Sequence, residues 1–547
     1  MRDPIYTFCR ELVPPSSVDR ACGLSFTRAG SSNLALARGN VLEVYKIELV
    51  PYHSDTSSTS GNGGDDYVYG EQHSGEEFDL PMIQDNANNG GSSRPANEQS
   101  QKANKTKRPQ MHLVGRWRLH GKIMDMQAVR GNEHGIENLV VSFSEAKMAV
   151  VSFCAATQSI VTESIHYYEH EQLQHTMRNS DAVSCALRGD PEGRCVVLRI
   201  YDDQLAVLPL NEVAENGGEG RAFGDSYVVD MRATSNIRSI HDCVFLSGYL
   251  EPTLALLHEP DAMWAGTLDA SVDSCCVTVV SLDLARRSAS TINSVGRLPY
   301  DSRTLVAVPA PIGGVLVVSS SALTHVANGA VSCIAVLSKA AARGIGCSAA
   351  DAIDRTSEGL GLVLDPRQCA WAFVAPAAAV LWTQHGLCLQ LALHTDGRSA
   401  VRRIAATLVA GSAKPEPAAD AWDDVGVVPS CVAELRVAYD DDDDGGSPVD
   451  AVLVFVGGSA GRSILIQAEE SSRAAGDELM DVDADLYGSS SKSSGSLWRL
   501  AVADELLGTG PAAAVEAGAS GSSGDDLQVV SCAGNAWRGR LRVQQRA

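Results

Sequence analysis

Two segments decide the fold of this chain: residues 248–260 (GYLEPTLALLHEP) and residues 305–318 (LVAVPAPIGGVLVV). Each segment joins a turn that contains proline or glycine to a short apolar run. This pattern is typical of a buried strand that is entered from a tight turn. In the first segment, Pro252 fixes its own φ angle and has no N–H to donate, so it suits the first residue of a strand.

The second segment has the same features in a longer turn. Pro309 and Pro311 restrict the backbone before the apolar run. Gly313 and Gly314 relieve steric limits where the backbone must turn or approach another segment closely. By themselves, these features indicate an all-β protein of no particular kind.

Both segments resemble one family, the large subunit of the cleavage and polyadenylation specificity factor. The similar motifs are Gly-Tyr-x-Glu-Pro-Thr-Leu in the first segment and Val-Pro-x-Pro-Ile-Gly-Gly in the second. The large subunit of damaged-DNA-binding protein and the propeller subunit of the branch-site splicing factor share weaker versions of both. Residues 273–275, 281–282 and 298–301 favour the polyadenylation factor by their order and spacing. The family signature, which we interpret as structural, consists of Gly248, Tyr249, Glu251, Pro252, Thr253, Trp264, Pro309, Pro311, Gly313 and Gly314.

The resemblance implies an all-β fold, a seven-bladed β-propeller of the non-WD type with divergent blades. The rhythm of short strands alone would also fit an array of sandwiches or barrels. The one Trp-Asp dipeptide, Trp422-Asp423, does not recur at the length of a blade. We predict a first propeller over residues 12–500, and the start of a second, truncated propeller over residues 501–547.

Three polar segments are expected to interrupt the first propeller as disordered insertions, at residues 51–109, 437–449 and 469–496. Segments so poor in apolar residues bury too little surface to offset the entropy of ordering. The first insertion ends in a basic cluster at residues 102–108. Such a cluster fits a nuclear-import or RNA-binding patch, although it is more often a solvated loop.

The charge of the chain argues against a general nucleic-acid-coating surface. The chain has 44 Lys and Arg against 67 Asp and Glu, a formal net charge of −23, whereas phosphate binding needs clustered basic residues. Aromatic residues make up only 5% of the sequence, and they do not alternate with basic residues as in an RNA-recognition sheet. We expect contact with pre-mRNA to be weak or indirect.

The cysteines and the N-terminus indicate the cellular compartment. The 14 cysteines are scattered without a C-x-x-C pair, and several, such as Cys195, Cys333 and Cys388, lie in apolar runs. This distribution predicts reduced, buried thiols in a nuclear or cytosolic protein. The first four residues lack the apolar region of a signal peptide.

One segment, residues 370–393, is nearly all apolar and about long enough to span a bilayer. Residues 384–386 (QHG) interrupt it, and leucines then alternate with other residues. We predict two strands joined by a turn in place of a transmembrane helix, and no membrane association.

Two groups of residues invite a binding interpretation. Residues 457–463 (GGSAGRS) differ from a phosphate-binding loop in glycine spacing, in the Arg where Lys belongs, and in the strand that follows. A hairpin turn is the better interpretation. His166 and His170 would share one face of a helix, as zinc ligands do. No third ligand is clearly placed, and Tyr167-Tyr168 favours the end of a strand.

A third group, His241-Asp242-Cys243, contains a base, a carboxylate and a nucleophile by residue type. Adjacent residues of a strand point to opposite faces, so they cannot act on one another as a Cys-His pair must. No pair of carboxylates stands out for hydrolase chemistry. We predict no catalytic, metal-binding or cofactor-binding residues, no cofactor and no enzymatic activity.

The resemblance implies a scaffold subunit of the nuclear pre-mRNA cleavage and polyadenylation machinery. Its partners would be a zinc-finger subunit and a WD-repeat subunit that recognise AAUAAA, an endonuclease module and poly(A) polymerase. One alternative is a propeller adaptor of a ubiquitin ligase or a splicing complex. Another is a propeller enzyme, which would need convergent acidic or metal-ligating residues on one face.

Overall fold

A computed structural model describes seventeen stretches of the chain: residues 17–51, 107–131, 135–144, 146–169, 186–201, 203–211, 223–260, 273–339, 352–396, 400–409, 425–439, 449–459, 461–470, 498–508, 512–520, 526–533 and 540–545. The chain divides into two compact units, Met1–Glu48 with Pro109–Ala547, and Leu49–Arg108. The description below concerns the first unit.

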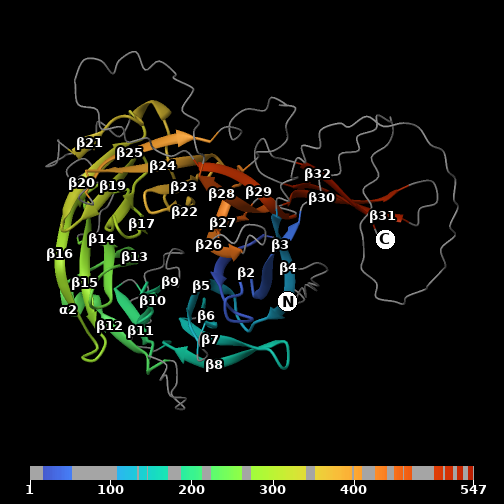
Figure 1. Cartoon of the computed structure of the whole chain (residues 1–547), viewed down its shortest axis with the longest axis horizontal. Coiled ribbons are helices and arrows are strands. Elements are labelled where there is room, and N and C mark those ends of the chain that lie inside the picture. Colours follow the sequence, from blue (N-terminus) through green and yellow to red (C-terminus); the bar gives the residue numbers. More distant parts are fainter. Residues whose placement is uncertain are drawn as a thin grey trace, which may run out of the picture. The chain divides into compact units, whose positions relative to one another are not determined.

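Seven sheets in a ring form a seven-bladed β-propeller, which confirms the predicted fold class (Figure 1). Within each blade, strands that are consecutive in sequence are neighbours. First strands of adjacent blades contact one another, as β1 contacts β5 and β26, so the first strand of a blade is innermost. Blade one consists of β1 (Arg20–Leu24), β2 (Asn33–Arg38), β3 (Val41–Pro51) and β4 (Lys107–Arg118), and blade two of β5 (Ile123–Arg130), β6 (Glu137–Phe143), β7 (Lys147–Cys154) and β8 (Ser159–Tyr167). Blade three consists of β9 (Leu187–Gly189), β10 (Cys195–Tyr201), β11 (Gln204–Pro209) and β12 (Tyr227–Asp230). Blade four consists of β13 (Ile240–Leu246), β14 (Thr253–His258), β15 (Cys275–Asp283) and β16 (Ser288–Leu298).

Blades five to seven continue the same order, with one addition. Blade five has a short fifth strand that pairs parallel to the fourth. Blade five consists of β17 (Thr304–Ala307), β18 (Val315–Val318), β19 (Ala322–Ala327), β20 (Ala330–Val336) and β21 (Ile353–Asp354). Blade six consists of β22 (Ala370–Ala375), β23 (Ala378–Trp382), β24 (Cys388–Thr395) and β25 (Val401–Leu408). Blade seven consists of β26 (Pro429–Tyr439), β27 (Val449–Gly458), β28 (Ser463–Glu470) and β29 (Trp498–Leu506).

The ring closes where β26 of blade seven lies beside β1 of blade one. The hydroxyl of Ser32 donates to the carbonyl of Arg436 at 3.1 Å, and the hydroxyl of Ser430 donates to the carbonyl of Val18. Gly23 permits the close approach of the two strands, because a Cβ there would lie 2.5 Å from the carbonyl oxygen of Glu434. We call this junction the closure seam.

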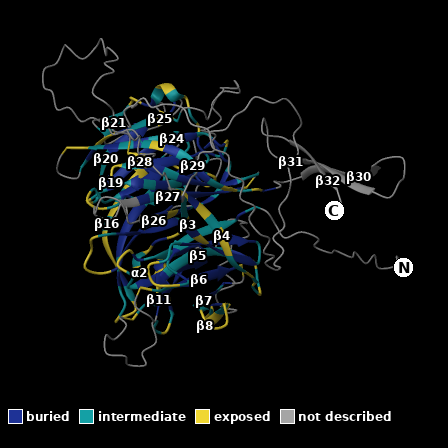
Figure 2. Cartoon of the chain, turned by 45° about the vertical axis from the view of Figure 1, so that its right-hand side comes forward, coloured by how far each residue is buried: buried dark blue, intermediate teal, exposed yellow. Residues whose placement is uncertain are grey.

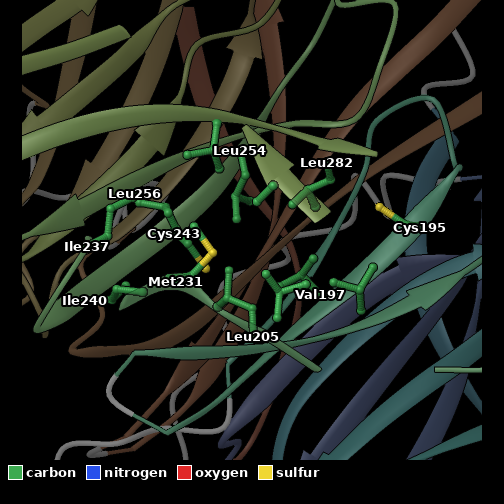
Figure 3. Packing of buried hydrophobic residues seen from close by; sticks show 14 of the residues in the cluster. Cys195, Val197, Leu205, Met231, Ile237, Ile240, Cys243, Leu254, Leu256 and Leu282 are labelled. Carbon is green, nitrogen blue, oxygen red and sulfur yellow. The ribbon is translucent and has the colours of Figure 1, made fainter. Parts of the chain in front are cut away.

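Many strand residues of the ring are buried (Figure 2). Their apolar side chains form clusters between adjacent blades, as sheet packing requires. Figure 3 shows the cluster between blades three and four, to which Met231 of the short helix α2 (Met231–Ser235) contributes. The expected burial of cysteines is confirmed for Cys195, Cys333 and Cys388. Burial also raises the pKa of the Cys333 thiol to about 12.

The hairpin predicted at residues 457–463 is confirmed, since β27 and β28 pair antiparallel on either side of it. The pairs β2–β3 and β6–β7 are also antiparallel hairpins. The prediction of two strands in residues 370–393 was wrong in number. Three strands occupy this segment, because a further turn at Pro376 and Ala377 separates β22 from β23. Apolar residues on both sides of that turn concealed it. Among the described residues, no helix is long and apolar enough to cross a membrane.

Strands occupy the ends of the segments that were predicted as disordered insertions. β4, β26, β27 and β28 each extend into one of them, because ladder hydrogen bonds tolerate polar side chains: Glu469 pairs with Arg499, for example. The rest of the three insertions lies outside the described residues. β29 runs across the predicted boundary at residue 500, and β30 (Ala512–Ser520), β31 (Asp526–Ala533) and β32 (Arg540–Gln545) form a further sheet. The division into two propellers stays a prediction.

Candidate binding site

The two segments that carry the family signature lie in adjacent blades, four and five. The loop between β13 and β14 follows the first strand of its blade, as does the loop between β17 and β18, so both emerge on the same face of the ring. Together they line a pocket of about 350 Å³. Five signature residues line it: Gly248, Tyr249, Pro311, Gly313 and Gly314.

The pocket has an uncharged lining. Apolar side chains such as Leu246, Val279 and Ile312 share it with the amides of Asn293 and Asn328, and no charged side chain lies among the described lining residues. A pocket without charge does not suit a phosphate, a carboxylate or a metal ion. It suits a neutral group of moderate size.

The β13–β14 loop is fixed to blade three by one arginine. Arg194 donates from Nη1 to the carbonyls of Tyr249 and Leu250, at 2.9 and 2.7 Å. Its other guanidinium nitrogens bind Asp190 and Glu192, and Glu192 Oε1 accepts the amide of Gly248 at 3.0 Å. This loop is therefore held in place although the side chain of Leu250 at its tip is 100% exposed.

The β17–β18 loop is closed by its own backbone. The amide of Gly313 donates to the carbonyl of Pro309, and the amide of Val308 donates to that of Gly314, both at 3.1 Å. Gly314 has a φ of +82°, and a Cβ there would lie 2.7 Å from the carbonyl oxygen of Val326. His325 Nε2 lies 3.0 Å from the Gly313 carbonyl oxygen. The turn therefore needs glycine at position 314 for both conformation and space.

The remaining signature residues of the first segment hold blade four together. The hydroxyl of Ser281 on β15 donates to Glu251 Oε2, and the hydroxyl of Thr253 donates to the carbonyl of Glu251 at 2.9 Å. The amide of Leu282 donates to the carbonyl of Pro252 at 2.9 Å. These contacts support the structural interpretation of the signature. Trp264 lies outside the described residues.

The group His241-Asp242-Cys243 lies on β13, as expected for a strand. Asp242 binds Arg188 of β9 and the backbone amide of Leu305. His241 Nε2 lies 3.5 Å from Glu259 Oε2, yet burial, together with nearby Arg303, lowers the His241 pKa to about 3. Burial raises the pKa of the Cys243 thiol to about 11. Neither group is prepared for catalysis near neutral pH.

The remaining candidates from the sequence are His166, His170 and residues 457–463. His166 lies between two hydroxyls, 3.0 Å from Ser164 and 2.9 Å from Ser226, while His170 lies outside the described residues. Burial lowers the His166 pKa. In the part of the chain that the structure describes, no group of three or more His, Cys, Asp or Glu residues could hold a metal ion. Residues 457–463 lie at the β27–β28 hairpin, as predicted.

The signature predicted from the sequence includes five residues that line the pocket, and other residues of the pocket and its rim were not predicted. Asn293 and Asn328, which line the pocket, and Arg194, which binds its rim, lie outside both segments and were not singled out. Asn328-Gly329 is a turn dipeptide typical of hairpins, and it could have indicated the turn between β19 and β20. Nothing in the sequence indicates that Asn293 faces the same pocket.

Part of the chain is similar to a known family of propellers. Residues 102–342 match the family model described as the RSE1/DDB1/CPSF1 first beta-propeller. Two plant relatives are named as subunit 1 of one of these factors. The chain is 27% identical over 336 residues to the probable cleavage and polyadenylation specificity factor subunit 1 of Oryza sativa subsp. japonica. It is 28% identical over 309 residues to the cleavage and polyadenylation specificity factor subunit 1 of Arabidopsis thaliana.

A fungal relative, protein cft1 of Schizosaccharomyces pombe, is 28% identical over 336 residues. These alignments cover 58%, 53% and 58% of this chain. They cover 21%, 21% and 22% of the relatives, so the chain spans about a fifth of the proteins that it matches. The resemblance to the large subunit of the cleavage and polyadenylation specificity factor is thereby confirmed.

Proposed function

We propose that this chain acts as part of a scaffold subunit of the nuclear pre-mRNA cleavage and polyadenylation machinery. The observation that carries this proposal is the combination of two matches. Residues 102–342 match a first-propeller model, and two plant relatives are named as subunit 1 of the cleavage and polyadenylation specificity factor. A role in 3′-end processing of mRNA accounts for both.

The features of the pocket favour a binding role over a catalytic role. The pocket between blades four and five has an uncharged lining and a rim held by hydrogen bonds, which are features of a preformed binding surface. In the described residues, the titratable groups that sequence analysis singled out are engaged in structural contacts. We propose a binding role for this chain, without enzymatic activity or a cofactor.

The proposed partners are the subunits that recognise AAUAAA, namely a zinc-finger subunit and a WD-repeat subunit. An endonuclease module and poly(A) polymerase would assemble on the same platform, and the complex would act in the nucleus. A rigid propeller suits this role because it presents loops of variable sequence in fixed positions. Pre-mRNA would be held mainly by the partners.

The family model also names RSE1 and DDB1, so an adaptor of another complex is the competing proposal. The test is affinity purification of the tagged full-length protein from nuclear extract, followed by mass spectrometry, with an untagged strain as control. Recovery of zinc-finger, WD-repeat and endonuclease subunits supports the proposal. Recovery of cullin or splicing subunits in their place contradicts it.

A further inference from the structure

The tip of the β13–β14 loop presents a leucine to solvent. Leu250 is 100% exposed, and the adjacent Tyr249 is 36% exposed. Of the large hydrophobic residues that the structure describes, Leu507 follows at 68%. Single apolar residues are common on protein surfaces, so exposure alone indicates no function. Leu250, however, combines full exposure with a backbone that is held by another blade.

Arg194 of blade three holds this tip in place. Its Nη1 donates to the carbonyls of Tyr249 and Leu250 at 2.9 and 2.7 Å. The guanidinium is itself fixed, because Asp190, whose side chain is 0% exposed, accepts from Nε and Nη2 at 2.6 and 2.8 Å. A backbone that is already ordered loses little conformational entropy when its side chain binds. Leu250 is therefore preorganised for insertion into another surface.

The charges around the tip define the surface that would receive it. Three carboxylates, those of Asp190, Glu192 and Glu251, accompany the single guanidinium of Arg194 on the loop and its support. The tip thus has an excess of negative charge, and the side chain of Glu192 is 38% exposed. A complementary surface has Lys or Arg beside an apolar pocket.

The same charges argue against two other occupants. The carboxylates would repel the phosphates of RNA, and Arg194 already binds Asp190 and Glu192. A symmetric contact between two copies of the chain would bring the same negative surfaces together. The complementary occupant is a different protein.

We propose that Leu250 inserts into an apolar pocket of a partner protein, and that Lys or Arg residues at the edge of that pocket face Glu192 and Glu251. The proposal rests on the scaffold function, to which it adds the residue that anchors one partner. The contact requires no change in the conformation of the propeller.

Photo-crosslinking locates this partner. The tagged full-length protein carries p-benzoylphenylalanine at position 250, is irradiated in nuclear extract and is purified for mass spectrometry. We expect a crosslink to one protein, within a peptide that has apolar residues beside Lys or Arg. Val363, which is 59% exposed, is the matched control position and should not crosslink to that peptide. A crosslink from position 250 to RNA or to a second copy of the chain, or no crosslink beyond the control, overturns the proposal.

Substitution of Leu250 tests whether binding of the crosslinked protein depends on this side chain. Leu250→Asp should bind that protein roughly 10- to 100-fold more weakly in surface plasmon resonance, as expected for the loss of one buried leucine. Val363→Asp should keep the affinity of the unmodified protein. The melting temperature of Leu250→Asp should not fall, because the replaced residue is fully exposed. Equal affinity of Leu250→Asp and the unmodified protein overturns the proposal.

Arg194→Lys tests the support of the tip. This variant keeps the positive charge, but an ammonium group cannot reproduce the fork that joins Asp190 to two carbonyls. Binding of the crosslinked protein should weaken roughly fivefold, because the loop must then be ordered when it binds. An unchanged affinity would contradict the role of the fixed backbone.

The identity of the partner separates this contact from the proposed function. If the partner that depends on Leu250 is a cullin or splicing subunit, the contact stands and the scaffold function in polyadenylation is contradicted. If the zinc-finger, WD-repeat and endonuclease subunits copurify equally with Leu250→Asp and with the unmodified protein, and no crosslinked protein depends on Leu250, the scaffold function stands and the contact is rejected.

Discussion

Arg188 Nη2 lies 3.2 Å from Asp242 Oδ1, and Nη1 of the same guanidinium lies 3.2 Å from Asp125 Oδ2. One side chain of blade three thus joins carboxylates from the innermost strands of blades two and four. The second oxygen of Asp242 accepts the amide of Leu305 in blade five at 2.9 Å. A continuous polar connection therefore links four neighbouring blades near the axis of the ring.

Removal of this arginine should destabilise the propeller. Arg188→Met leaves Asp125 and Asp242, whose side chains are only 17% and 12% exposed, without their shared cation. The expected loss is about 2–3 kcal/mol in the free energy of unfolding, measured by urea denaturation. Arg286→Met is the control: that side chain is 85% exposed, and its loss should change stability by less than about 0.5 kcal/mol. Equal effects of both variants would contradict the role of Arg188.

The arginine at the pocket rim should control the mobility of one loop. Arg194→Ala removes the hydrogen bonds to the carbonyls of Tyr249 and Leu250 and the support of Glu192. Amide exchange in residues 247–252 should become roughly tenfold faster, since hydrogen bonds to charged groups are the stronger ones. Hydrogen-exchange mass spectrometry measures this, with Arg286→Ala as control. An unchanged exchange rate would show that other contacts hold the loop.

Two buried histidines should make the fold sensitive to acid. Burial lowers the pKa of His241 to about 3 and that of His258 to about 4, from an ordinary value of 6.5. The unfolded chain therefore binds more protons than the native chain below pH 6.5, and stability is lost as the pH falls from 6.5 towards 4. The expected slope is about 1.4 kcal/mol per pH unit for each histidine.

The variant His241→Gln with His258→Gln tests this dependence. Its free energy of unfolding should change less between pH 6.5 and pH 4.5 than that of the unmodified protein. His112→Gln serves as the control, because the His112 side chain is 52% exposed. The same acid sensitivity in all three proteins would place its origin in other groups.

The isolated chain should not bind polyadenylation-signal RNA tightly or specifically. The chain has 44 basic against 67 acidic residues, and its clearest basic cluster is the short one at residues 102–108, whereas phosphate contacts need many clustered cations for high affinity. Fluorescence anisotropy with AAUAAA RNA and a scrambled control, at two salt concentrations, should show weak, salt-sensitive binding that does not distinguish the sequences. Nanomolar binding that does distinguish them would make this propeller a direct reader of the signal.

The sheet β30–β32 should contribute little to the stability of the ring. A chain that ends at residue 508 keeps all four strands of blade seven, including β29. Its melting temperature should match that of the full chain within experimental error, as expected for separate cooperative units. A large decrease would mean that these strands belong to the first propeller.

Local features of the fold were predictable from the sequence, and contacts between blades were not. The hairpin at Gly39 and Asn40 could be located because glycine and asparagine interrupt two apolar runs. Pro376 was overlooked because apolar residues lie on both sides of it. The pocket combines residues from 246 to 400, and Arg188 is 54 residues from Asp242. Such distant pairs leave no periodic pattern in a single sequence.

The closure seam has a consequence for how the chain folds. In the described ring each blade consists of strands that are consecutive in sequence, so its pairing can form soon after that blade leaves the ribosome. The seam joins Ser32 to Arg436, which are 404 residues apart, and no earlier blade can substitute for the seventh. One apolar face of the first blade therefore stays exposed to solvent until nearly the whole ring has been synthesised. Since distant contacts form slowly, the first blade is the part of the nascent chain most in need of protection by a chaperone.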